Sequence, residues 1–136
     1  MTPPEKVYLI DTNVILRFLL DDHAVFSPKA RALMREVSGK IRLAVIPAAV
    51  LAECVYVLDK FYHVPRDEIT DTLSRTLTIP GIINADKAEL LKALLLFRQF
   101  GSDIVDCMLA ASSSEQAPVV SFDQDLDRLK ALTETI

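Results

Sequence analysis

Four acidic side chains occupy places in the sequence where an ordinary solvated charge is not expected. Asp11 and Asp123 each directly follow a short run of strand-forming residues, "VYLI" and "VVSF". Glu53 and Asp106 interrupt apolar stretches with helical spacing, and neither has a basic residue three or four positions away. Because burying an unpaired carboxylate is energetically costly, each of these acids is predicted to have a partner other than a local salt bridge.

A divalent cation would be such a partner. Carboxylate oxygens are the ligands that Mg²⁺ and Mn²⁺ prefer, and the charge of the ion offsets the repulsion among the acids. The chemistry that such a set supports is metal-assisted hydrolysis of a phosphodiester bond. The predicted catalytic and metal-binding residues are Asp11, Glu53, Asp106 and Asp123.

Simpler roles are open for several of these residues. Asp11 and Asp123 could each be the N-cap of a following helix, and Asp103 could be a first-turn acid that complements the helix dipole. His23 and His63 stand in polar contexts and are predicted to be surface residues rather than a catalytic acid–base pair.

Short apolar runs and helical patterns alternate along the chain and predict the elements that must position the acids. Strands are expected at 7–10, 43–46, 79–83 and 119–122, and helices at 13–20, 28–37, 48–61, 66–77, 85–100, 104–113 and 124–132. Strands separated by helices indicate a central parallel sheet in a three-layer α/β/α domain. Function gathers at the carboxyl ends of such strands, where Asp11 and Asp123 are placed.

Composition indicates one domain over residues 1–136, because 51% of the residues are hydrophobic and no linker or repeat interrupts them. Cys54 and Cys107 lack metal-ligand spacing and are predicted to be small core residues. No signal peptide or lipidation motif is visible, and the longest apolar run, 43–58, is too short for a membrane span. We therefore expect a cytoplasmic protein without membrane association.

The net charge of −4 is unlike that of a generic nucleic-acid binder, although part of it lies in the predicted site. Five basic residues do fall close together, and they could contact RNA phosphates or form an ordinary solvated helix face. They are Lys29, Arg31, Arg35, Lys40 and Arg42.

The segments "LIDTNVIL", "AAVLAECVYVL", "SDIVDCMLAA" and "VVSFDQDLDRL" follow one another in an order that resembles PIN domains. The chain looks most like the small VapC-type toxins of type II toxin–antitoxin pairs. That resemblance implies a Mg²⁺- or Mn²⁺-dependent endoribonuclease with an antitoxin protein as partner, bound in a groove beside the acids. It also implies that Thr12, Asn13, Asp103 and Ser121 hold the carboxylates or bound waters in place. Within "SDIVDCMLAA" either Asp103 or Asp106 could be the third acid, and Asp106 matches the family pattern better.

Two other functions remain open: a PIN-fold binding module without catalysis, and a phosphohydrolase similar to haloacid dehalogenases. The latter resemblance is weaker, because such enzymes have a second Asp where this chain has Asn13. A homodimer is also expected, since the segment "AELLKALLLF" offers more apolar surface than a small sheet can cover.

Overall fold

The first strand of the chain belongs to a short parallel sheet. The computed structural model describes residues 6–134, in which β1 (Val7–Leu9) pairs with β2 (Leu43–Val45). On the far edge of β2, Ala44 forms a parallel bridge with Ile82. The strand expected at 79–83 is therefore reduced to a single bridge. Two flanking hydrogen bonds hold it, from the Ala44 N–H to the Gly81 carbonyl and from the Ile83 N–H to the Ala44 carbonyl, each at 2.9 Å.

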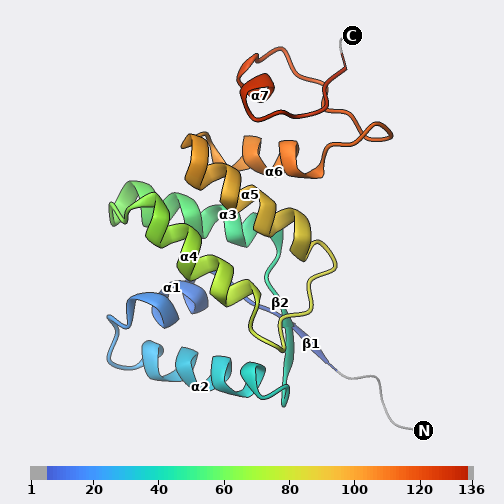
Figure 1. Cartoon of the computed structure of the whole chain (residues 1–136). Helices are drawn as coiled ribbons and strands as arrows, with labels where there is room; N and C mark the ends of the chain where they lie inside the picture. Colours follow the sequence, from blue (N-terminus) through green and yellow to red (C-terminus); the bar gives the residue numbers. More distant parts are fainter. Residues whose placement is uncertain (1–5, 135–136) are drawn as a thin grey trace, which may run out of the picture.

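The helices follow the predicted order (Figure 1). They are α1 (Thr12–Leu20), α2 (Phe26–Ser38), α3 (Ala48–Tyr56), the π-helix η1 (Val57–Phe61), α4 (Arg66–Leu77), α5 (Lys87–Phe100), α6 (Ile104–Ser112) and α7 (Asp125–Arg128). The helix expected at 48–61 thus changes to π geometry after Tyr56. The one expected at 124–132 is only four residues long, because Lys130 adopts a left-handed backbone with φ of 57°.

The strand predicted at 119–122 does not join the sheet. Val119 instead bridges Thr133, with its N–H donating to the Leu132 carbonyl at 2.7 Å. Figure 1 places this C-terminal segment beyond α6, at the end of the molecule away from β1. Pairing with residues 132–134 closes a much shorter loop than pairing with β1 would, and loop closure costs less entropy when the loop is short.

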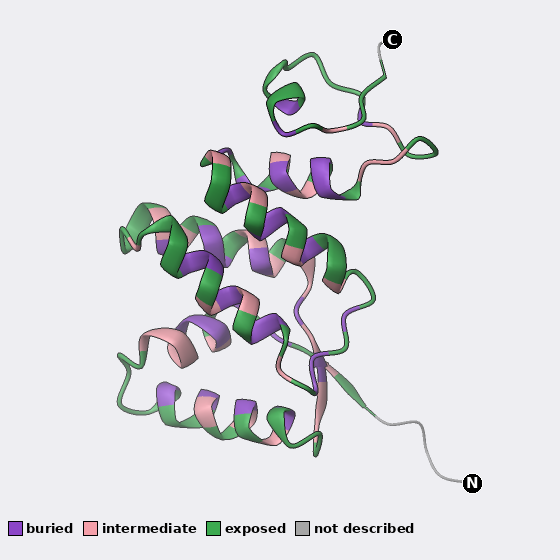
Figure 2. Cartoon of the chain, in the orientation of Figure 1, coloured by how far each residue is buried: buried purple, intermediate pink, exposed green. Residues whose placement is uncertain are grey.

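The core lies mainly among the helices. α1 packs on α2 and α3, α4 on α5, and α5 on α6. Ile10, Ala44 and Ile46 are buried, whereas Leu9 is 75% exposed, so one face of the sheet is better covered than the other (Figure 2). The predicted α/β class with a parallel sheet is confirmed.

Most of the apolar surface of α5 belongs to this core. Leu90, Ala93, Leu94 and Phe97 are buried, and Leu95 is the large apolar residue of that helix that stays largely exposed. The surplus of apolar surface that favoured a homodimer is therefore smaller than expected. Within the described residues, no helix is long and apolar enough to cross a membrane.

Gly81 marks the closest backbone approach around the sheet. A Cβ atom on it would lie 2.8 Å from the carbonyl oxygen of Arg42, and closer still to that of Val37. Both oxygens belong to backbone that cannot move without disturbing α2 or β2. At Gly39, by contrast, the nearest atom to an added Cβ would be 3.7 Å away.

We expect Gly81→Ala to lower the free energy of unfolding by about 1–3 kcal/mol, because the methyl group would force backbone apart. Gly39→Ala is the matched control and should be neutral, or more stable by up to about 1 kcal/mol, since its φ of −83° suits alanine. Urea unfolding of the two variants measures the difference. Equal stability of both would show that the approach at Gly81 is looser than described.

Candidate active site

Asp11 follows β1 and stands at the N-cap position of α1. Its backbone carbonyl accepts hydrogen bonds from Val14 at 3.1 Å and Ile15 at 3.4 Å, but its carboxylate accepts none from the helix. The carboxylate is exposed and contacts no donor in the described residues. The simple capping role is therefore wrong for the Asp11 side chain, whose charge is left available at the positive end of a helix.

Thr12 has an unusual environment next to Asp11. Its side chain is only 4% exposed, and its hydroxyl has no hydrogen-bond partner in the described part of the chain. A buried hydroxyl without a partner costs about 1–3 kcal/mol, and such groups in native proteins usually bond an ordered water or an ion. This hydroxyl is thus a free polar group directly beside the first acid.

Glu53 belongs to the same region as Asp11. It lies on the exposed side of α3, the helix that packs against α1. The thiol of Cys54, next to Glu53 in the chain, is buried, and its pKa is raised to about 12, first by burial and then by the negative charges of Glu53 and Asp11. Both carboxylates are therefore close enough to act on one thiol, and we call Asp11 and Glu53 the first acidic pair.

Asp106 lies in a second group of acids. Its side chain on α6 is half-buried, and burial raises its pKa, followed by the charges of Asp103, Asp123 and Asp125. The carboxylate of Asp103 accepts a hydrogen bond from the Val105 N–H at 2.8 Å and caps α6. Asp106 makes no such bond, so of these two acids it is the one with a free carboxylate.

Asp123 is held by a turn that leads into α7. Its N–H donates to the Ser121 hydroxyl at 3.0 Å, and its carboxylate accepts from the Asp125 N–H at 2.9 Å. Ser121 thus orders the backbone at Asp123, as a residue expected to position that acid would. We call Asp106 and Asp123 the second acidic pair.

The two pairs do not meet in the described conformation. The described residues contain no group of three or more His, Cys, Asp or Glu side chains placed to hold a metal ion. The expectation that the four acids are buried is also incorrect: three are exposed and Asp106 is half-buried. On α3 and α6 the buried positions belong to other residues, whereas Asp11 and Asp123 lie outside the helices, before α1 and α7. The metal-binding and catalytic roles of the four acids stay predictions.

The other chemistry-bearing residues are placed as follows. His23 and His63 are exposed, as expected, and the Nδ1 atom of His23 accepts hydrogen bonds from two N–H groups at the start of α2. Cys54 and Cys107 are buried free thiols, which confirms their predicted core role.

The basic span at 29–42 has fewer free cations for contacts with RNA phosphates than its sequence suggests. Arg31 pairs with Asp21, and Arg42 pairs with Glu36 and donates to the Tyr8 hydroxyl at 2.6 Å. Two of its five cations are therefore already engaged by acids within the chain.

Comparison with known proteins gives one match. The family model described as PIN domain matches residues 8–132. The chain belongs to the PIN domain family. No curated protein and no solved structure matches it.

Membership places this chain on a nuclease-type fold, since PIN domains are commonly nucleases. The matched segment includes both acidic pairs of this PIN domain. The sequence pattern does not single out Arg17 or Tyr62, which lie 45 positions apart and meet through a side-chain hydrogen bond between α1 and the end of η1. The spacing of Glu53 and Tyr56, three residues apart on one helix, is the signal that could have drawn attention to that region.

The separation of the two pairs is testable by titration. In metal-free buffer, Asp123→Asn should lower the pKa of Asp106, because it removes a negative charge that disfavours ionisation. Asp11→Asn should leave it unchanged, as should Asp71→Asn on α4. Carboxyl NMR titration measures all three.

A pKa of Asp106 that falls in Asp11→Asn as far as in Asp123→Asn would mean that the four acids converge in solution.

The raised pKa of Asp106 also has a consequence for stability. The folded protein holds this proton more tightly than the unfolded chain, so the ionised Asp106 destabilises the fold as pH rises through that pKa. Asp106→Asn should remove this loss at neutral pH and change little in strong acid.

Proposed function

We propose that this PIN domain is an endoribonuclease that depends on Mg²⁺ or Mn²⁺, and that it is the toxin of a toxin–antitoxin pair. The observation that carries the proposal is the free, exposed carboxylate of Asp11 beside the partnerless hydroxyl of Thr12, with Glu53 nearby. Neither side-chain group accepts or donates a hydrogen bond within the described residues. An exposed acidic pair is open to a large substrate such as RNA.

The reaction is hydrolysis of a phosphodiester bond, in which water adds to phosphorus and the bond to the leaving ribose oxygen breaks. Carboxylates are the predominant polar groups of the proposed site, and His23 caps a helix instead of joining it. A hard divalent cation is the cofactor that such oxygens suit, and when bound it supplies charge stabilisation at the phosphate.

The described conformation does not fit a complete metal site, since neither acidic pair belongs to a group of three possible ligands. The partnerless Thr12 hydroxyl and the free Asp11 carboxylate fit part of one. A site that used all four acids would require the second acidic pair to approach α1 and α3. Asn13, exposed on the first turn of α1, would then be available to orient a bound water or phosphate oxygen.

A PIN-fold binding module without catalysis is the competing hypothesis. The carboxylates of Asp11 and Asp106, which accept no hydrogen bond within the described residues, argue against it. A phosphohydrolase similar to haloacid dehalogenases is not favoured by the family match. Cleavage assays on RNA and on small phosphate esters separate the three functions.

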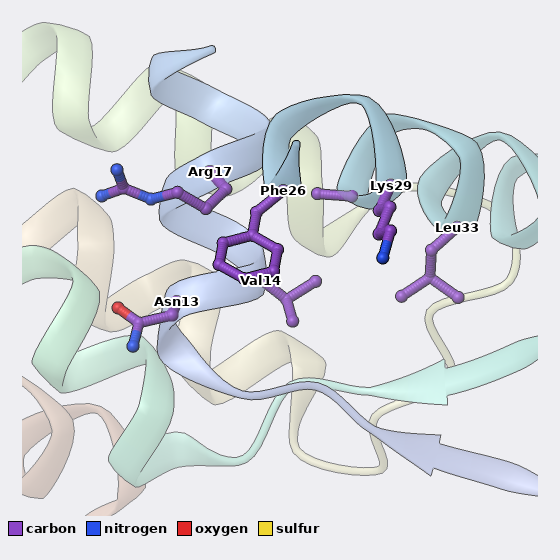
Figure 3. Close-up of a pocket in the computed structure, with 7 residues that line it drawn as sticks. Asn13, Val14, Arg17, Phe26, Lys29 and Leu33 are labelled. Atoms are coloured by element: carbon purple, nitrogen blue, oxygen red, sulfur yellow. The ribbon is translucent and has the colours of Figure 1, made fainter. Parts of the chain in front are cut away.

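The antitoxin is the proposed protein partner, and the structure offers a hollow of about 400 Å³ for it (Figure 3). The hollow lies between α1 and α2 and is lined mainly by apolar side chains, among them Val14, Phe26 and Leu33. Asn13, which lies two positions after Asp11 in the chain, is part of the lining of the hollow. An apolar segment seated there could extend a basic side chain to the first acidic pair.

Self-association is also part of the proposal. Three large apolar side chains, Leu95 on α5 and Val105 and Leu109 on α6, remain exposed on two helices that pack together. A homodimer would cover them. This surface is distinct from the hollow between α1 and α2.

Asp11→Asn should separate a catalytic role from a structural one. Because the carboxylate caps nothing, the metal-free variant should melt at the same or a higher temperature than the parent. It should lose most of the thermal stabilisation given by Mn²⁺ or Mg²⁺, and RNA cleavage should fall at least about a hundredfold. Asp71→Asn, an exposed acid on α4, is the matched control. Full activity and an unchanged metal response in Asp11→Asn would refute the proposed site.

The toxin role predicts inhibition by a specific partner. The product of a short reading frame adjacent to this gene, added to the purified protein, should stop RNA cleavage in competition with RNA. Leu33→Asp should weaken the complex by placing a charge in the hollow, whereas Lys40→Asp, outside the hollow, should not. Unimpeded cleavage within a stable complex would contradict a competitive antitoxin.

A further inference from the structure

Three exposed aromatic residues lie in or next to η1, which follows α3. The exposed fractions are 64% for Tyr56, 79% for Phe61 and 41% for Tyr62. The rings of Phe61 and Tyr62 are tilted by 53° with centroids 6.0 Å apart, so they do not stack face to face. Their faces are therefore available to another planar group.

The π-helix contributes to this arrangement. The Tyr62 N–H donates to the Val57 carbonyl five residues earlier, at 3.2 Å, rather than four residues earlier as in an α-helix. Tyr56 and Tyr62 flank this π-helix, and Phe61 is its last residue. π-Helical turns are frequent at functional sites.

The aromatic residues adjoin the first acidic pair along two neighbouring helices. On α3, Tyr56 follows Glu53 by three residues, so both project from one side of the helix, and both are exposed. On α1, Arg17 follows Asn13 by four residues, and Figure 3 shows the two side chains pointing to the same side. α1 itself begins directly after Asp11.

Arg17 ties the two helices together. Its guanidinium donates to the Tyr62 hydroxyl at 3.4 Å and to the Asp22 carboxylate at 2.7 Å. The bond to Tyr62 raises the pKa of Arg17, with a further contribution from Asp22, so the group stays cationic. Arg17 therefore connects α1 to the exposed ring of Tyr62, and its charge is already paired with that of Asp22.

We propose that Tyr56, Phe61, Tyr62 and Arg17 form a binding surface for single-stranded RNA, which stacks its bases on the rings and leads the strand to Asp11 and Glu53. This inference rests on the proposed ribonuclease function. Stacking of a base on an aromatic side chain contributes about 1–3 kcal/mol and tolerates any base, because every base has a π face. In a duplex the base faces are covered, so double-stranded RNA should not use these rings.

RNA fits this surface better than a protein partner does. The patch is aromatic and carries two phenolic hydroxyls and a guanidinium, which suit bases and phosphates. The hollow between α1 and α2 is lined mainly by apolar side chains and is the surface suited to a peptide.

The test measures binding of a fluorescein-labelled, unstructured oligoribonucleotide by anisotropy, in the Asp11→Asn background so that the RNA stays intact. Replacing both Tyr56 and Phe61 with Leu keeps apolar bulk but removes the π faces. The double variant should bind at least about tenfold more weakly. Phe61→Tyr should retain binding, and Phe122→Leu, which changes an exposed ring beyond α6, should match the background. A duplex of the same sequence should bind weakly to all variants.

Unchanged affinity for single-stranded RNA in the double Leu variant, with an unaltered melting temperature, would overturn the inference. So would equal loss in Phe122→Leu, or a loss of antitoxin binding without loss of RNA binding. The result is independent of hydrolysis: a parent protein that binds through these rings but never cleaves RNA would refute the proposed function and leave the binding surface standing. If the parent cleaves RNA and the double variant binds RNA as tightly as the background, the binding surface is refuted and the proposed function stands.

Discussion

The burial of one side of α3 is the constraint on which the rest of the site depends. Leu51, Cys54 and Val55 are buried in the core, and this fixes the rotation of the helix about its axis. Glu53 and Tyr56 then point outward, because they lie on the opposite side of the same turn. α1 is set in the same way by buried Ile15 and Leu16, which leaves Asn13 exposed. The packing of apolar side chains on α1 and α3 therefore determines which polar residues of these helices face the solvent.

The separation of the acids into two pairs limits the repulsion among them. Four carboxylates brought together would disfavour one another's ionisation, and two separate pairs reduce that repulsion. Even within the second group, neighbouring negative charges raise the pKa of Asp106. The C-terminal segment is held apart from α1 by its own contacts, including the Arg128 guanidinium on the Ser102 hydroxyl at 2.7 Å. Charge and local packing thus favour the same arrangement.

Phosphate contacts from basic residues are the main sequence-independent contribution to nucleic-acid binding. Arg31 and Arg42, within the most basic span of the chain, are already paired with acids. The exposed rings at the end of α3 and in η1 offer base stacking in addition to phosphate contacts. Arg17 lines the hollow between α1 and α2 and also donates to the Tyr62 hydroxyl. The surfaces proposed for RNA and for the antitoxin therefore adjoin at Arg17, which agrees with competitive inhibition.

The sequence by itself determined what depends on local pattern. Helical periodicity predicted α1 through α6 with small errors at their ends, and it predicted the buried cysteines, since a helix turns the same positions inward in any fold that it joins. The order of four acids along the chain indicated the family. Local pattern also left Asp11 as either a helix cap or a free carboxylate, which the absence of a side-chain bond decided.

Only the tertiary structure decided how distant segments meet. The run "VVSF" reads as a strand, but nothing in it states whether its partner is β1 or the segment at 132–134. The contact between Arg17 and Tyr62 joins residues 45 positions apart, and no local periodicity encodes such a pair. The change to π geometry after Tyr56 is equally invisible in a pattern of apolar residues. Pairing, rotation and contact between elements depend on the packing of the whole chain, and that packing determines which acids are neighbours.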